Sequence, residues 1–122
     1  MEASFTVFCE EQASFVNTVR MRSNDSGEVW LSNYVRELVA PVGKERLIEV
    51  EIRQQLSARN VRLLYGRITD ELKPDPSLEL AYSFHCTMKS RIELPEARSF
   101  FIEFCKGYGI ESEYKYDAGY ID

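Results

Sequence analysis

The stretch that decides the predicted fold is Leu78–Lys89, which reads LELAYSFHCTMK. Its even-numbered residues, from Leu78 to Met88, are all apolar, and its odd-numbered residues are mostly polar. A period of two over this length is typical of a β-strand with one buried face and one exposed face. The pattern therefore predicts a long strand, and it places His85, the only histidine, on the exposed face of that strand.

Further strands are predicted on both sides of this run. Alternating apolar residues favour strands over 4–9, 48–53, 61–68 and 110–116. Residues 57–60 then form the loop of a hairpin between the second and third of these strands. A helix over 44–57 is the alternative to the second strand, because its apolar residues also lie four positions apart.

Apolar residues at helical spacing predict three helices, over 10–22, 31–39 and 95–107. Residues 10–22 also have good strand propensity, so a strand remains the alternative there. Pro41 and Gly43 end the second helix, and Pro95 begins the third.

Together these elements predict an α+β fold in a single domain over residues 1–122. We expect a two-layer structure, with an antiparallel sheet of about five strands and two or three helices packed on one face. The other face of the sheet would carry polar and charged side chains, namely Glu49, Glu51, Arg53, Glu79, Ser83, His85, Thr87, Glu111, Glu113 and Lys115.

The composition is that of a small acidic globular protein. Its net charge of −5 argues mildly against nucleic acid as the main partner and favours a basic protein. No apolar run approaches the roughly 18 residues that a membrane-spanning helix needs. Glu2 stands where a signal peptide would carry positive charge. We therefore expect a cytoplasmic protein without membrane contact, whose three cysteines, Cys9, Cys86 and Cys105, are buried reduced thiols.

Most catalytic machinery is missing from the sequence. One histidine and three scattered cysteines do not supply the four closely spaced ligands of a typical zinc site. There is no Gly-rich phosphate loop and no Gly-x-Ser-x-Gly elbow. We assign no catalytic residue, no cofactor and no metal. A small carboxylate-dependent enzyme remains an alternative, because Glu49/Glu51 and Glu111/Glu113 are pairs of acids about 6–7 Å apart along a strand.

The segment 44–67 is basic and forms the predicted hairpin. Its arginines include Arg53, Arg59, Arg62 and Arg67, which could contact phosphate. Nucleic-acid binding through this hairpin is therefore a second alternative. Tyr65 is the only aromatic residue of the segment, whereas proteins that bind single strands interleave several.

Tyrosines and acids gather near the C-terminus. Tyrosine is enriched at interface hot spots, and neighbouring carboxylates select a basic partner. Combined with the expected open face of the sheet, this pattern indicates seven partner-binding residues: Glu79, His85, Glu111, Glu113, Tyr116, Asp117 and Tyr120.

The sequence thus favours a small acidic protein-interaction module that binds a basic protein partner. In size, charge and lack of catalytic groups the chain resembles the immunity proteins that neutralise nuclease toxins, although no motif carries the resemblance. The resemblance implies a toxin inhibitor that occludes its partner's active site, steered by charge and anchored by aromatic residues. An exposed sheet edge can also pair two copies into a homodimer.

Overall fold

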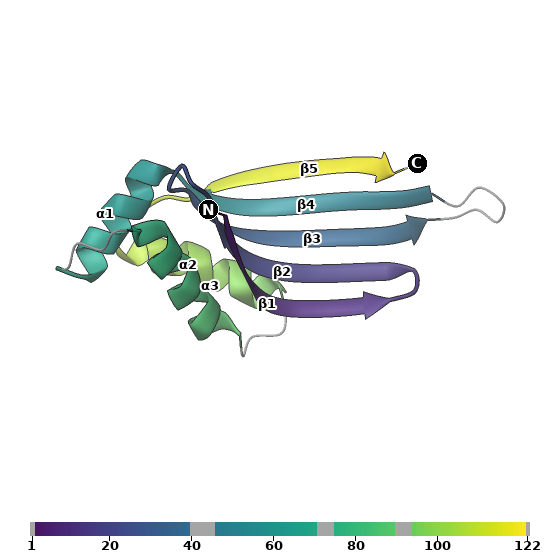
Figure 1. Ribbon diagram of the computed structural model, residues 1–122, viewed down its shortest axis with the longest axis horizontal. Helices are drawn as coiled ribbons and strands as arrows, with labels where there is room; N and C mark the ends of the chain where they lie inside the picture. Colours follow the sequence, from purple (N-terminus) through teal and green to yellow (C-terminus); the bar gives the residue numbers. More distant parts are fainter. Residues whose placement is uncertain (1, 40–45, 71–74, 90–93, 122) are drawn as a thin grey trace.

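Each strand of the sheet lies beside its neighbour in sequence. The computed structural model describes residues 2–39, 46–70, 75–89 and 94–121. It has one five-stranded antiparallel sheet in the order β1-β2-β3-β4-β5, with three helices packed against it, which confirms the predicted α+β fold (Figure 1). The elements are β1 (Ala3–Gln12), β2 (Phe15–Ser23), β3 (Val29–Val39), β4 (Arg46–Leu56), α1 (Ala58–Ile68), α2 (Pro76–Met88), α3 (Leu94–Gly107) and β5 (Glu113–Ile121).

The helices cover only one end of the sheet, and the strands extend well beyond them (Figure 1). Almost fully buried side chains fill the space between the two layers, among them Met21, Leu31, Leu56, Leu64 and Phe101. Because successive strand residues point to opposite faces, Trp30 and Ser32 point away from this core. We call the face of the sheet that is turned away from the helices the open face.

One edge of the sheet, β1, is irregular and partly covered. The pairing of β1 with β2 shifts register between Thr6 and Phe8, which leaves Val7 as an extra residue in a β-bulge. Val7 is buried, Phe8 packs against the same core, and α2 contacts both β1 and β2. Bulges and covering helices are two ways in which proteins protect a sheet edge from unwanted pairing.

The run Leu78–Lys89, on which the predicted architecture depended, is helical rather than extended, because nearly all of it belongs to α2. A series of apolar residues at every second position also contains pairs four positions apart, which lie on one side of a helix. Leu80, Phe84 and Met88 form such a series and are buried, whereas Tyr82 is exposed. The strand prediction was wrong because alternation over this run is equally compatible with a helix that buries every fourth residue.

Local signals at the start of α2 favour the helix. The carboxylate of Asp75 accepts hydrogen bonds from the backbone N–H of Leu78 at 3.2 Å and from the hydroxyl of Ser77 at 2.6 Å. Pro76 occupies the first turn, where its missing N–H costs no helical hydrogen bond. His85 therefore belongs to the helical layer, and its predicted position on the open face was wrong.

The predicted strand over 61–68 and its hairpin loop over 57–60 were also wrong. The Ser57 hydroxyl caps α1 by accepting a hydrogen bond from the backbone N–H of Asn60 at 3.2 Å. The buried residues of this helix, Val61, Leu64 and Tyr65, have helical spacing. A capped helix thus replaces the second arm of the expected hairpin.

The two helices predicted over 10–22 and 31–39 are strands. β2 pairs along its whole length with β3, from Val29 to Glu37, and Val19 and Met21 of β2 are buried under the helices. Gly27, with a φ of 84°, donates its N–H to the Asn24 carbonyl at 3.1 Å in the turn between these strands. The free energy gained from continuous strand pairing and burial exceeds the weak preference for a helix that the spacing of the apolar residues indicates. Tertiary structure often overrides local propensity in this way.

The remaining predicted elements are confirmed. The predicted strands over 4–9 and 48–53 lie within β1 and β4, and the helix over 95–107 corresponds to α3. The last predicted strand, over 110–116, overlaps β5, which extends further, to Ile121. In the described part of the chain, no helix combines the length and apolar character that crossing a membrane requires.

The three cysteines differ in exposure. Cys105 on α3 is buried, and burial raises the pKa of its thiol to about 12. Cys9 and Cys86 are exposed, so the prediction of buried thiols was correct only for Cys105.

Candidate functional site

The structure brings together four of the seven predicted partner-binding residues. Glu111 lies just before β5, and Glu113, Tyr116 and Asp117 lie on it. All four side chains are exposed. Tyr120 is on the same strand, but its side chain lies outside the described part of the structure.

The other two predicted residues, Glu79 and His85, lie elsewhere. Both are on α2, which packs against β1 and β2 at the side of the sheet away from β5. His85 stacks on Phe5 of β1, and its Nδ1 is buried without a hydrogen-bond partner among the described residues. Glu79 is exposed beside a groove of about 240 Å³ between the helices. Neither residue adds to a surface shared with β5.

β5 is exposed from Glu113 to Gly119. It pairs with β4 in an unbroken register, yet every described side chain from Glu113 to Gly119 is exposed. β5 is also the last strand in the sheet order, and Figure 1 shows it at the upper edge. We define the β5 surface as the exposed acids and tyrosines in and just before this strand: Glu111, Glu113, Tyr114, Tyr116 and Asp117.

The two tyrosines of the β5 surface lie on the helix side of the sheet. Tyr114 is opposite Gln54, and the guanidinium of Arg98 on α3 lies 4.7 Å from the centroid of its ring. Tyr116 lies two residues further along the same face. Their side chains are 51% and 60% exposed, so neither is a core residue.

The charged residues of β5 lie on the open face. Glu113, Lys115 and Asp117 alternate with the tyrosines, and their partners on β4 include Arg53 and Glu51. Among the described residues, the carboxylates of Glu111, Glu113 and Asp117 make no ion pair. Because acids and tyrosines point to opposite faces, a partner that contacts both sets has to lie along the edge of β5.

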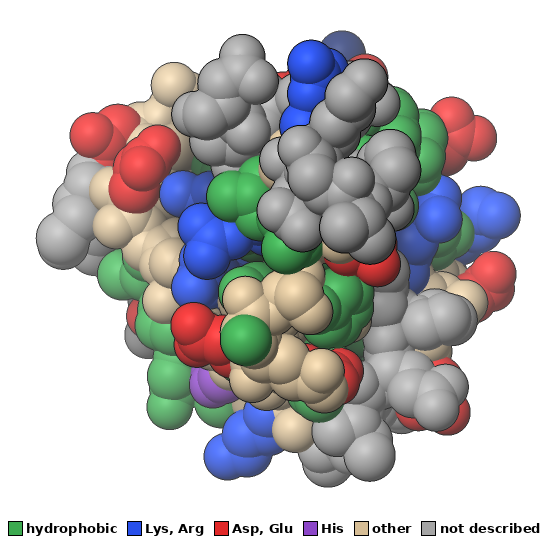
Figure 2. Space-filling model, turned by 90° about the vertical axis from the view of Figure 1, so that its right-hand side faces the viewer, with side chains coloured by type: hydrophobic (Ala, Val, Ile, Leu, Met, Phe, Trp, Pro, Cys, Tyr) green, Lys and Arg blue, Asp and Glu red, His purple; other side chains and the backbone are tan. Residues whose placement is uncertain are grey.

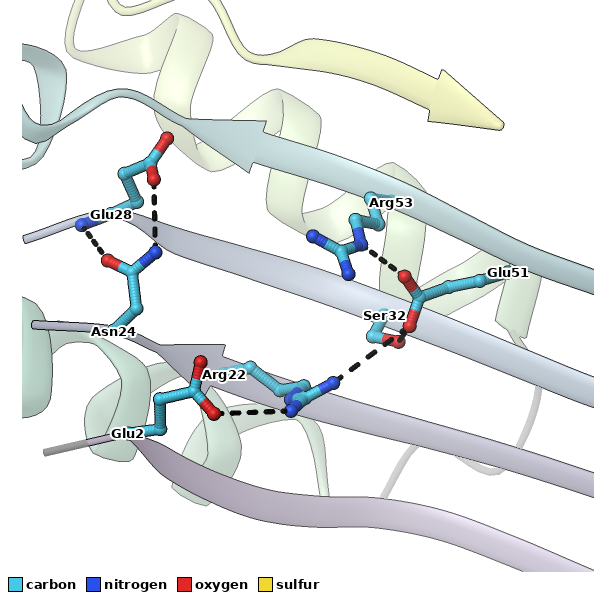
Figure 3. A network of polar contacts seen from close by, with 7 residues as sticks. All are labelled: Glu2, Arg22, Asn24, Glu28, Ser32, Glu51 and Arg53. Atoms are coloured by element: carbon cyan, nitrogen blue, oxygen red, sulfur yellow. Dashed lines mark hydrogen bonds and ion pairs between the residues drawn. The ribbon is translucent and has the colours of Figure 1, made fainter. Parts of the chain in front are cut away.

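A polar network surrounds Trp30 on the open face, and sequence reasoning missed it. Figure 3 shows its polar side chains, without Trp30 itself. Trp30 is only 3% exposed because the guanidinium groups of Arg22 and Arg53 lie 5.5 and 5.0 Å from the centroid of its ring. Glu51 accepts a hydrogen bond from the Ser32 hydroxyl at 3.0 Å and pairs with both arginines. The alternation of Trp30 with Leu31 would have placed this tryptophan on the open face, had β3 been predicted as a strand.

The network continues toward the turn between β2 and β3. Arg22 lies 3.9 Å from the carboxylate of Glu2, and the amide of Asn24 donates a hydrogen bond to Glu28 at 3.0 Å (Figure 3). Glu28 also accepts a hydrogen bond from the side chain of Gln55 at 2.6 Å. These contacts order the polar surface around Trp30.

Several side chains of the network line a depression of about 420 Å³ in the open face. Its lining includes three arginines and three acids, namely Arg20, Arg22, Arg53, Glu49, Glu51 and Asp117. Tyr34 lies among them, and burial together with a hydrogen bond to Glu49 raises the pKa of its hydroxyl. Charges of both signs are therefore balanced here, and Figure 2 shows the same mixing on the end of the sheet away from the helices.

The arginines of the basic segment 44–67 do not form one patch. Arg53 of β4 is held by Glu51, and Arg67 of α1 donates a hydrogen bond to the carbonyl of Tyr108. Arg59 and Arg62 are exposed on α1. The basic hairpin predicted for nucleic-acid binding is a strand followed by a helix, so that structural prediction was wrong.

Within the described residues, no three histidine, cysteine or acidic side chains are grouped closely enough to hold a metal ion. Comparisons with models of protein families, with curated proteins and with solved structures gave no match. The function therefore has to be inferred from the geometry of this chain alone.

Proposed function

We propose that this protein is an interaction module that binds a basic protein partner through the β5 surface. The supporting observation is that three carboxylates, which make no ion pair with any described residue, and two exposed tyrosines lie together in and beside one edge strand. Acids that are fixed in this way attract and orient a cationic surface before contact. Tyrosine rings then bury a large area at a low cost in side-chain entropy.

The most specific form of the proposal is an inhibitor of the immunity type, which occludes the active site of a basic partner such as a nuclease toxin. Such an inhibitor needs complementary charge and rigid anchors, but no catalytic groups. The β5 surface is supported by continuous pairing with β4 from Glu113 to Ile121 rather than by a mobile loop. This support preorganises its side chains and lowers the entropy lost on binding.

The test begins with chemical crosslinking in the source cell to identify the partner, which is then purified. Its affinity is measured by calorimetry over a series of salt concentrations. We expect binding to weaken as salt rises, and we expect Glu111→Lys with Glu113→Lys to weaken it by at least about tenfold. Tyr116→Ala should weaken it as well, mainly by faster dissociation.

The matched control is Glu10→Lys with Glu11→Lys. This variant makes the same change of charge at two neighbouring exposed acids on β1, at the opposite edge of the sheet. We expect it to reduce the affinity much less than the β5 variant does. An affinity that does not depend on salt, and that falls equally in the two variants, would reject the β5 surface as the binding site.

A second candidate is the carboxylate-dependent enzyme. The observation that favours it is that Glu49 and Glu51 line the same depression as Tyr34. Hydrolytic turnover of a model ester, phosphoester or glycoside that is lost in Glu49→Gln and in Glu51→Gln, with the fold retained, would support this candidate. Turnover that is unchanged in both variants would exclude these carboxylates as its acid and base.

A further inference from the structure

The two edges of the sheet are built differently. β1 has a bulge and is contacted by α2. β5 has no register shift against β4, contains no proline, and exposes all its described side chains. In the described part of the chain, no strand pairs with its outer edge. An edge of this kind presents unpaired N–H and C=O groups to another strand.

We propose that the outer edge of β5 pairs antiparallel with the same edge of a second copy of this chain, about a two-fold axis at Tyr116. The two sheets then form one continuous ten-stranded sheet, since each copy contributes five strands. This inference goes beyond the proposed function and does not depend on it. Because both use the outer edge of β5, the second copy and a basic partner compete for the same strand, and the dimer has to dissociate before the partner binds.

The order of charges along β5 supports this partner. With Tyr116 opposite Tyr116 of the second copy, antiparallel pairing places Lys115 opposite Asp117 of that copy, and the two-fold axis repeats the pair. Side chains directly opposite in an antiparallel pair lie close together, and opposite charges there are stabilising. The edge lysine that usually discourages pairing is thus matched by an acid.

The remaining positions of β5 fit the same register. A two-fold axis perpendicular to the sheet keeps the faces of the two copies aligned, so the Tyr116 rings meet on the helix side. Tyr114 lies opposite Ala118 of the second copy, and Glu113 lies opposite Gly119. At both of these positions a large residue faces a small one. On the axis itself the two Tyr116 rings face each other, and aromatic contact between them is favourable.

The two neighbouring registers are electrostatically unfavourable. An axis at Lys115 places this lysine opposite Lys115 of the second copy. It also places Glu113 opposite Asp117 of that copy. An axis at Asp117 places two aspartates directly opposite each other. Like charges that face each other across strands are destabilising, so the charge pattern favours the axis at Tyr116 over both.

The first experiment measures the mass of the purified protein by sedimentation equilibrium, without any partner. We expect a dimer that dissociates on dilution. Lys115→Asp and Asp117→Lys should each weaken self-association by about tenfold or more, because each places like charges opposite each other. Combining the two substitutions exchanges the charges and should restore the dimer, which a general loss of stability would not do.

The second experiment tests the register with cysteines. In a background of Cys9→Ser and Cys86→Ser, which removes the two exposed thiols, we expect Tyr116→Cys to form a disulfide-linked dimer on mild oxidation. The Cα atoms of directly opposed residues in antiparallel strands lie about 4.5–5.5 Å apart, within the range that a disulfide spans. Tyr114→Cys is the control. In this register, position 114 of each copy lies opposite Ala118 of the other copy, so the two introduced cysteines are not opposite each other and should form little crosslinked dimer.

A protein that stays monomeric up to about 1 mM overturns the proposal. A dimer that withstands both single charge substitutions, or that crosslinks equally well through position 114, overturns the register and with it the pairing through β5. These outcomes are independent of the proposed function. Glu111→Lys with Glu113→Lys, which tests partner binding, leaves the Lys115–Asp117 pair intact and should leave the dimer unchanged.

Discussion

The imidazole of His85 stacks on the ring of Phe5, with ring centroids 5.7 Å apart and an angle of 28° between the planes. Tyr82 completes the cluster, with its ring 5.4 Å from that of Phe5 in an edge-on arrangement. The contact joins the first strand to α2. The only histidine of the chain therefore acts as an aromatic packing residue in this structure rather than as an exposed binding group.

Replacement of His85 by phenylalanine should keep this contact. His85→Phe preserves an aromatic ring and removes the buried Nδ1 that has no partner among the described residues. We expect the free energy of unfolding to stay the same or to rise by up to about 1 kcal/mol, whereas Phe5→Ala should lower it by about 1–3 kcal/mol. Urea denaturation of both variants measures the difference, and a larger loss in His85→Phe than in Phe5→Ala would contradict the packing role.

Removal of the arginine cover should expose Trp30. Trp30 is the only tryptophan, so its fluorescence reports on the open face alone. We expect Arg53→Ala to increase quenching by acrylamide and to lower the free energy of unfolding by about 0.5–2 kcal/mol. Arg59→Ala, at an exposed position of α1, is the control. Equal quenching in the two variants would show that Arg53 does not shield the indole.

The cap of α2 predicts a response to acid. Hydrogen bonds from Ser77 and Leu78 lower the pKa of the Asp75 carboxyl from its usual 3.8. The ionised carboxylate therefore stabilises the fold at pH values above 3.8. This contribution is lost as the pH falls through the lower pKa of the folded state. We expect Asp75→Ala to cost about 1 kcal/mol at neutral pH, and Asp75→Asn to cost less. Thermal unfolding between neutral and acidic pH should show that the difference between wild type and Asp75→Asn disappears in acid.

The buried thiol of Cys105 predicts a response to alkali. Burial raises its pKa from 9.0 to about 12. Between these values the unfolded chain loses the thiol proton while the folded chain keeps it, so stability falls as the pH rises, by about 1.4 kcal/mol per pH unit. Cys105→Ala should remove this part of the alkaline decline in the free energy of unfolding, measured by urea denaturation.

In the native protein, thiol reagents should label Cys9 and Cys86 but not Cys105. Rapid labelling of Cys105 in the native state would contradict its burial.

The fold class could be predicted although several of its elements could not. β4, α3 and β5 were recognised because pattern and boundary signals agreed there: Gly107 ends α3, and alternation resumes in β5. α2 was missed because alternation pointed to a strand and the capping signal at Asp75 and Pro76 was not recognised. β3 was missed because its apolar residues also lie at helical spacing, whereas its strand conformation is supported by pairing with β2 and β4.

The candidate site was predictable only where it is local in sequence. Glu111, Glu113, Tyr116 and Asp117 lie within a few residues of one another, so any extended conformation brings them together in and just before one strand. Glu79 and His85 were added to that surface through a strand that the chain does not form. The network around Trp30 draws on three strands and could not be seen before their register was known.

By itself, the sequence determined the local features of this protein: the mixture of strands and helices, the helix that begins near Pro95, and the acidic, tyrosine-rich character of the last strand. Only the tertiary structure decided which of two compatible periodicities each segment adopts and that β5 lies at an exposed edge. The physical reason is that propensities and caps depend on neighbours along the chain. Strand pairing and burial depend on residues that are distant in sequence, and their combined free energy exceeds a local preference.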